Sequence, residues 1–63
     1  MGIGERIKRM REARNMTQEE LGARLDVTKS MVGQIERGTR TLSLPMAKQI
    51  AEIFGIGLED LAR

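Results

Sequence analysis

The chain has 63 residues and a net charge of +2, and it contains neither histidine nor cysteine. This length suits a single domain, expected over residues 1–63. The missing residue types exclude disulfide frameworks, Cys/His zinc sites and the usual Ser-His or Cys-His nucleophile pairs, so no metal, cofactor or enzymatic activity is predicted. No apolar run approaches the roughly 18 residues of a membrane span, which favours a soluble, cytoplasmic protein with no membrane partner.

Apolar residues at helical spacing begin the chain. Ile3, Ile7 and Met10 recur at intervals of four and three residues, which predicts an amphipathic helix over about residues 3–14. The same stretch carries five basic and two acidic side chains. This charge is compatible with a solvated helix face and also with a surface that faces phosphates, and the sequence leaves both interpretations open.

The next two predicted helices are separated by only about three residues. Thr17 and Glu20 have the spacing of a capping box, in which each side chain accepts a hydrogen bond from the backbone amide of the other residue. A second helix is therefore expected at residues 18–25. Thr28 is the next N-cap candidate, and it opens a third helix that continues to about Arg37.

Two further helices complete the chain. Gly38 can take the left-handed conformation at a helix end, and the polar residues after it form a loop. Ser43 caps a fourth helix, which tolerates Pro45 in its first turn and ends at Gly55. A last short helix is indicated by the apolar residues Ile56, Leu58 and Leu61. Because no strand pattern competes, the predicted fold is all-α: a compact five-helix bundle.

The second and third helices form the informative unit. Two short helices can cross steeply at such a close connection only where a small side chain lies at their contact, and Gly22 provides one between Leu21 and Val32. The outer face of the third helix then projects from the domain. A single α-helix fits the major groove of B-DNA, where the base edges display distinguishable donors and acceptors.

These segments resemble the Cro and cI-like, or xenobiotic-response-element, family of helix-turn-helix domains over nearly the whole chain. The strings that carry the resemblance are Ile3-Gly4-Glu5-Arg6-Ile7, Arg11-Glu12, Thr17-Gln18-Glu19-Glu20-Leu21, Val27-Thr28-Lys29-Ser30, Ile35-Glu36-Arg37-Gly38, and Ile50-Ala51 with Leu58-Glu59-Asp60-Leu61. The resemblance implies a lambda-repressor-like fold and sequence-specific binding of double-stranded DNA. It also implies a transcriptional regulator of the repressor type, with residues 28–37 as the recognition helix in the major groove.

The resemblance also assigns roles to polar side chains. Lys29, Ser30 and Gln34 are expected to read bases, since lysine donates to guanine and glutamine can pair with adenine through two hydrogen bonds. Met31, on the same outer face, is a candidate for contact with a thymine methyl group. The expected phosphate contacts come from Gln18, Thr28, Arg37, Thr39, Arg40 and Thr41. For both sets, an ordinary solvated surface is the alternative.

Other residues are expected to hold the fold together. The resemblance pairs Arg11 with Glu36 in a bidentate bridge that would orient the third helix, and two unrelated surface charges are the alternative. Gly33 interrupts the third helix, either because the DNA backbone approaches it closely or as a tolerated imperfection. Asp26 stands where the family usually has glycine in the turn, although aspartate tolerates left-handed geometry. The core is expected to be filled out by Met10, Met16 and Met46.

A single reading helix covers only a few base pairs, so a second copy is expected on the DNA. The chain is predicted to be a weak homodimer, or to dimerise on DNA, through the candidates Ile56, Leu58 and Leu61. The alternative function is that of a protein-interaction module, because antitoxin-like and co-activator-like proteins resemble the same family. A large exposed apolar patch would favour that alternative.

Overall fold

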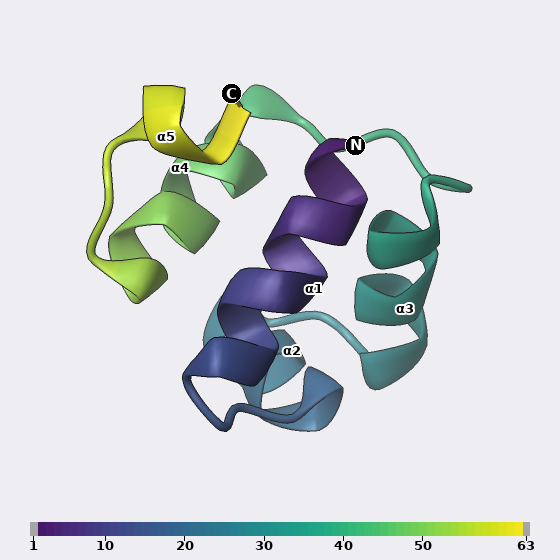
Figure 1. The fold of residues 1–63 in the computed structure, drawn as a ribbon. Helices are drawn as coiled ribbons and strands as arrows, with labels where there is room; N and C mark the ends of the chain where they lie inside the picture. Colours follow the sequence, from purple (N-terminus) through teal and green to yellow (C-terminus); the bar gives the residue numbers. More distant parts are fainter. Residues whose placement is uncertain (1, 63) are drawn as a thin grey trace.

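Five helices form the protein in the computed structural model, which describes residues 2–62. They are α1 (Ile3–Ala13), α2 (Gln18–Leu25), α3 (Lys29–Arg37), α4 (Leu44–Phe54) and α5 (Leu58–Ala62). α1 crosses the middle of the molecule, with α3 on one side of it, α4 and α5 on the other, and α2 behind its C-terminal end (Figure 1). The predicted all-α, five-helix bundle is confirmed, and the helix bounds differ from the expected ones by no more than a residue or so.

The three predicted N-caps are all formed. The Thr17 hydroxyl oxygen accepts from the Glu20 amide at 3.0 Å, and the Thr17 amide donates to Glu20 Oε1 at 2.8 Å, which completes the capping box. Thr28 accepts from the Met31 amide at 3.1 Å, and Ser43 starts α4 in the same way. These bonds satisfy amides that have no partner inside the helix, so the sequence defines where these three helices begin.

Helix ends use left-handed residues. Gly38 and Gly55 follow α3 and α4 with φ of 78° and 71°. After α2 the same role falls to Asp26, whose φ is 60°. A left-handed residue at this position turns the chain so that its amide bonds back to the last carbonyls of the helix. The departure from glycine at Asp26 therefore leaves the turn geometry intact.

The apolar faces of the helices meet in one core. Ile7, Leu21 and Leu61 are fully buried, and the other buried apolar residues are Leu25, Val32, Ile35, Ala47, Ile50, Ala51 and Phe54. Met10, Met16 and Met46 pack partly buried around this cluster, as expected of gap-filling methionines. Within residues 2–62, no helix is long and apolar enough to cross a membrane.

Two glycines bring helix backbones into direct contact. A Cβ on Gly22 would lie 2.8 Å from the Val27 carbonyl oxygen, which confirms the close crossing expected between α2 and α3. A Cβ on Gly4 would overlap the Ile35 carbonyl oxygen and come within 2.7 Å of that of Glu36. Sequence analysis did not single out Gly4, yet this contact lays the start of α1 directly on the last turns of α3.

We predict that Gly4→Ala destabilises the protein, while Gly33→Ala does not. The new methyl group at residue 4 meets backbone that cannot move aside, and overpacking of this kind costs about 1–3 kcal/mol or more. At residue 33 the nearest atom is the flexible end of Arg37, 3.1 Å away, so the gain of about 0.5–1 kcal/mol from alanine in a helix should dominate. Urea unfolding of both variants measures the difference; similar midpoints would contradict the contact at Gly4.

We also predict that the capping box weakens in acid. The hydrogen bond from the Thr17 amide, and to a lesser extent the one from the Thr17 hydroxyl, holds the pKa of Glu20 below its ordinary value of 4.5. Because the folded pKa is the lower one, this stabilisation is present above the unfolded pKa and is lost as the pH falls through the folded pKa. Stability should therefore fall less in Glu20→Gln than in the parent between neutral pH and about pH 3, with Glu19→Gln as the control in the same turn.

Candidate nucleic-acid interface

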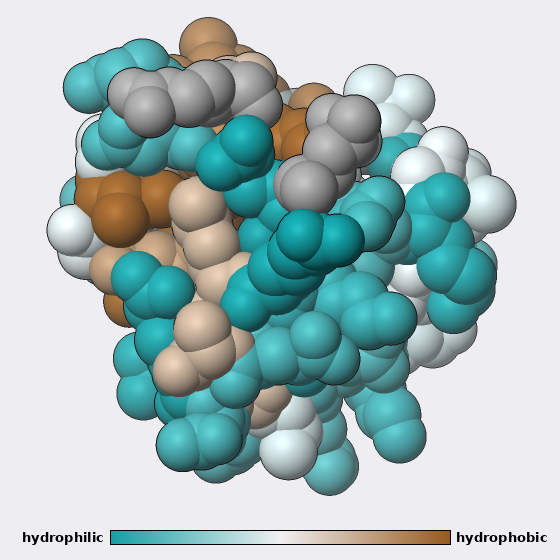
Figure 2. Space-filling view, viewed as in Figure 1, coloured by the Kyte–Doolittle hydropathy of each residue, from teal (hydrophilic) through white to brown (hydrophobic). Residues whose placement is uncertain are grey.

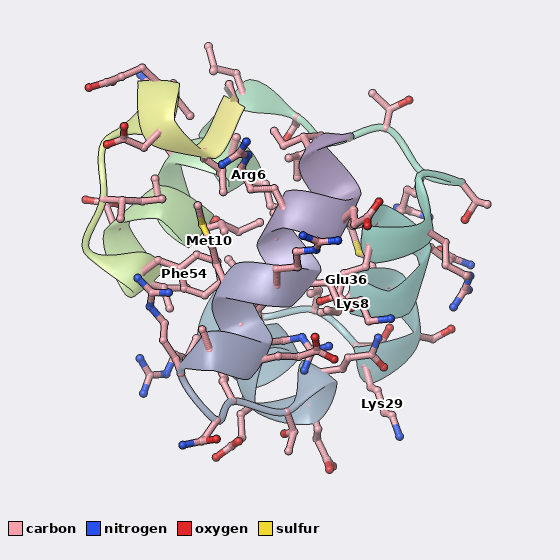
Figure 3. The ribbon with its side chains drawn as sticks, viewed as in Figure 1. Arg6, Lys8, Met10, Lys29, Glu36 and Phe54 are labelled. Carbon is pink, nitrogen blue, oxygen red and sulfur yellow. The ribbon has the colours of Figure 1, made fainter. Side chains whose placement is uncertain are left out.

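α3 has one face in the core and one face in solvent. Val32 and Ile35 are buried, whereas Thr28, Lys29 and Ser30 are exposed at its N-terminal end. Lys29 projects away from the bundle at this end of the helix (Figure 3). The predicted base-reading residues Met31 and Gln34 are half-buried beside the exposed set. The structure thus places Lys29 and Ser30 on the outer side of α3 with Gln34 half-buried beside them, whereas Met31 also packs against the core.

The loop after α3 folds back on its last turn. The amides of Gly38 and Thr39 donate to the carbonyls of Ile35 and Gln34 at 3.1 and 3.0 Å, the paired bonds of a Schellman motif. The Thr39 hydroxyl also donates to the Gln34 carbonyl at 3.2 Å. Arg40 Nη1 donates to the Gln34 side-chain oxygen at 3.4 Å. The candidate phosphate-binding loop is therefore fixed next to the predicted base-reading residue Gln34.

A buried ion pair holds the other side of α3. Arg11 Nε donates to Glu36 Oε2 at 2.7 Å and Arg11 Nη2 donates to Glu36 Oε1 at 3.1 Å, so the predicted bidentate bridge is present. The two side chains are only 9% and 2% exposed. The hydrogen bond to Glu36 raises the pKa of the Arg11 guanidinium above its ordinary value. The remaining Arg11 donor, Nη1, bonds to the Met16 carbonyl at 2.7 Å, which ties the α1–α2 turn to the same pair.

Gln18 extends this network to the start of α2. Its Nε2 donates to Glu36 Oε1 at 3.0 Å. Gln18 is half-buried and is the first residue of α2. An amide nitrogen carries two N–H groups, so a second N–H exists beside the one that binds Glu36. The predicted phosphate ligand is thus oriented by the carboxylate that also orients α3.

Gly33 is covered by side chains of this chain. A Cβ at this position would lie 3.1 Å from Arg37 Nη1 and 3.6 Å from Gln18 Nε2. Both interpretations of this glycine, close approach of a DNA backbone and a tolerated imperfection, stay predictions. In the structure a Cβ here would crowd only the flexible end of Arg37 and would be in ordinary contact with Gln18.

The basic side chains of α1 do not form one surface. Arg11 is buried in its ion pair, and Arg9 pairs with Glu5 at 3.2 Å on the exposed face. Arg14 Nη2 donates to the Phe54 carbonyl at 2.8 Å, and its guanidinium lies 4.8 Å from the centre of the Phe54 ring. In Figure 3 only Lys8 of the labelled cations on α1 lies on the side of α3. Arg9, Arg11 and Arg14 therefore make contacts within the chain, and a phosphate-facing first helix stays a prediction.

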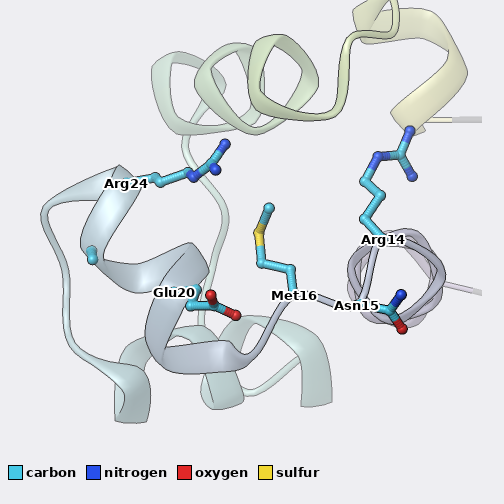
Figure 4. A pocket seen from close by; sticks show the side chains of 6 residues that line it. Arg14, Asn15, Met16, Glu20 and Arg24 are labelled. Atoms are coloured by element: carbon cyan, nitrogen blue, oxygen red, sulfur yellow. The ribbon is translucent and has the colours of Figure 1, made fainter.

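A hollow in the surface lies away from α3. The hollow in Figure 4 has a volume of about 320 Å³ and lies between the end of α1 and α2. It is lined by Arg14, Asn15, Met16, Glu20, Ala23 and Arg24. Within residues 2–62, no group of three or more acidic side chains is placed to hold a metal ion.

The dimer candidates differ in exposure. Leu61 is fully buried, so its prediction as a dimer contact is wrong: its side chain is consumed by the core. Ile56 and Leu58 are half-buried, and Leu44, which sequence analysis missed, is 60% exposed at the start of α4. Figure 2 shows hydrophobic surface gathered over α4 and α5, while the surface over α1 is mostly hydrophilic.

The close packing of α2 on α3 across a short turn, inside a bundle closed by three further helices, defines a helix-turn-helix protein. A protein-family model described as Helix-turn-helix matches residues 7–61, and the chain belongs to this family. An HTH-type transcriptional regulator of Methanocaldococcus jannaschii is 38% identical over 56 residues, which cover 89% of this chain and 85% of that protein. Control protein C.BamHI of Bacillus amyloliquefaciens is 34% identical, with 94% of this chain and 74% of that protein covered.

Solved structures share the fold. The restriction-modification controller protein C.AhdI of Aeromonas hydrophila superposes with a TM-score of 0.86 at 32% identity, over 94% of this chain and 86% of that chain. SinR, a master regulator for biofilm formation solved in complex with DNA, gives 0.83 at 27%, over 94% and 95%. The P22 c2 repressor gives 0.90 at 21% identity, over 100% and 96%, a likeness of fold. The lambda-repressor-like architecture expected from the sequence is thereby confirmed.

We predict that Arg11→Ala unfolds the protein far more easily than Arg9→Ala. Removing Arg11 leaves the buried Glu36 carboxylate without its cation, which costs about 3–5 kcal/mol. Arg9 and Glu5 are mostly exposed, and such a pair contributes about 0.3–0.5 kcal/mol. Denaturant unfolding at neutral pH compares the two. A double replacement, Arg11→Met with Glu36→Leu, should regain part of the lost stability, because no uncompensated charge is then buried. Equal unfolding midpoints for Arg11→Ala and the parent would refute the role of the bridge.

Proposed function

We propose that this protein is a transcriptional regulator that binds double-stranded DNA with α3 in the major groove. The observation that carries the proposal is the outer face of α3, whose exposed N-terminal residues stand clear of the bundle while Gly4, Arg11 and Glu36 hold the helix from behind. Relatives that are HTH-type transcriptional regulators support it, as does the similarity to SinR, which was solved with DNA.

In this proposal the bases are read from the exposed and half-exposed side of α3. Lys29 donates to guanine O6 or N7, Ser30 adapts to either partner, and Gln34 contributes an amide. Met31, half-buried beside them, can touch a thymine methyl group. Each side chain discriminates only among the bases that it can reach, so the specificity for one DNA sequence comes from all four side chains together.

Phosphate contacts flank the reading face on two sides. On one side lie the Gln18 amide and the exposed Thr28, both at the start of a helix, where unpaired backbone amides and the helix dipole favour an anion. On the other side lies the loop that follows α3, with the exposed residues Arg37, Thr39, Arg40 and Thr41. These contacts would set the register of the protein on the duplex without reading its sequence.

We propose repression as the mode of regulation, because a protein that occupies an operator excludes other proteins from the same DNA. Two copies are needed for this. The chain measures 25 × 23 × 20 Å, whereas the half-sites of a two-fold operator lie about 34 Å apart. Ile56 and Leu58 on the hydrophobic side of the bundle, together with the exposed Leu44, are the surface that we assign to the second copy.

A protein-interaction module is the competing function, and the surface does not favour it. Within residues 2–62, the exposed large apolar side chains are Ile3 and Leu44, at 37% and 60%. A docking site for a large protein partner would need a broader apolar patch. The polar side chains on the outer face of α3 instead favour DNA binding.

We predict that DNA binding weakens steeply as salt rises. Each phosphate that a lysine or arginine neutralises releases counterions, which gives a log-log slope of about −0.9 per phosphate. Arg37→Ala and Arg40→Ala should each make the slope shallower by about one unit, while Ser30→Ala, which removes no charge, should leave it unchanged. Titrations of a selected duplex at several salt concentrations measure the slopes. A flat response in the parent protein would contradict binding to the phosphate backbone.

We predict two copies on one palindromic duplex. The isolated chain should sediment as a monomer or a weak dimer, because Ile56, Leu58 and Leu44 supply little apolar surface for pairing. Adding a palindromic duplex with half-sites about 34 Å apart should give two chains per duplex with cooperative binding. Sedimentation of the free protein and of the complex measures both. Saturation of a single half-site by one chain at full affinity would argue against the second copy.

A further inference from the structure

The side chain of Gln34 is held by the loop that follows it. The left-handed Gly38 reverses the chain, and two donors of Thr39, its amide and its hydroxyl, bond to the Gln34 backbone carbonyl at 3.0 and 3.2 Å. This anchored turn carries Arg40 back beside α3. Arg40 Nη1 then donates to the Gln34 side-chain oxygen at 3.4 Å. The loop thus forms hydrogen bonds with both the backbone carbonyl and the side chain of Gln34.

The contact with Arg40 changes what the Gln34 amide offers to a ligand. A free glutamine amide presents one acceptor, its oxygen, and one donor group, its NH₂. With the oxygen turned to Arg40, the donor group remains for a partner, and the guanidinium beside it adds further N–H donors. The oxygen keeps its second lone pair, but it now lies beside a cation, and the pair presents more donors to a ligand than a lone glutamine does. Arg37, a second arginine at the end of α3, lies against Gly33 and takes no part in this contact.

We propose that Gln34 and Arg40 act as one composite reader that selects guanine, an inference that rests on the proposed DNA-binding function. In the major groove guanine displays two acceptors, N7 and O6, which match a set of donors. Adenine displays the acceptor N7 beside a donor, its N6 amino group, and therefore matches a glutamine whose oxygen is free. Arg40 thereby specifies the base that Gln34 reads, in addition to any phosphate contact.

This assignment differs from the one that the sequence suggests. Glutamine on a reading helix predicts adenine when its neighbours are ignored. Arg40 is six residues further along the chain, and only the Schellman turn at Gly38 brings it to Gln34. The base preference is then a property of the turn as well as of the helix.

The test is selection of bound sequences from a random duplex library by four proteins: the parent, Gln34→Ala, Arg40→Ala and Arg37→Ala. Gln34→Ala identifies the base pair that residue 34 reads, as the one whose preference disappears. Arg37→Ala is the matched control, because it removes the same charge from the same region without touching Gln34. Circular dichroism confirms that the variants are folded.

We expect guanine at the Gln34 position for the parent and for Arg37→Ala. For Arg40→Ala the preference should move toward adenine, with the guanine-to-adenine affinity ratio falling on the order of tenfold. Replacing that guanine by 7-deazaguanine should weaken parent binding more than Arg40→Ala binding. An adenine consensus for the parent, or an unchanged guanine preference in Arg40→Ala, would overturn the composite reader while leaving specific DNA binding in place. A parent protein that selects no consensus would contradict the proposed function itself.

Discussion

The buried bridge between Arg11 and Glu36 is the contact on which the rest of the interface depends. It joins α1 to α3 through two hydrogen bonds of 2.7 and 3.1 Å, with both side chains almost removed from water. Burying two charges is costly unless every donor and acceptor finds a partner. Here the same pair also binds the Met16 carbonyl and the Gln18 amide, and within residues 2–62 no buried side-chain nitrogen or oxygen lacks a hydrogen bond.

A bridge of this kind fixes the orientation of α3. A planar guanidinium and a carboxylate meet in one geometry, whereas contacts between apolar side chains are not directional. Gly4 acts in the same sense, because it lets the backbone of α1 rest on the carbonyls of Ile35 and Glu36. The reading helix is thus held from behind by a directional contact and by a steric one, and its outer face is left to polar side chains.

Polar side chains on that outer face are themselves organised by neighbours. Glu36 orients Gln18, and Arg40 orients Gln34. Gly33 lies beside the first arrangement, and the turn at Gly38 makes the second possible. A protein that recognises DNA with short helices gains from such support, because side chains already held in one rotamer lose less conformational entropy when they bind.

The sequence by itself determined the helices, their caps and the apolar stripes, because these depend on residues three or four apart. Thr17 with Glu20, Thr28 and Ser43 begin helices where their spacing predicts, and the family motif identified Arg11 and Glu36 as partners. Only the tertiary structure decided which residues far apart in the sequence lie in contact. It placed Arg14 against Phe54 and buried Leu61 in the core. It also placed Gln18 and Arg37 beside Gly33 and brought Arg40 to Gln34. Such contacts depend on crossing angles and on the path of turns, which no local pattern of residues encodes.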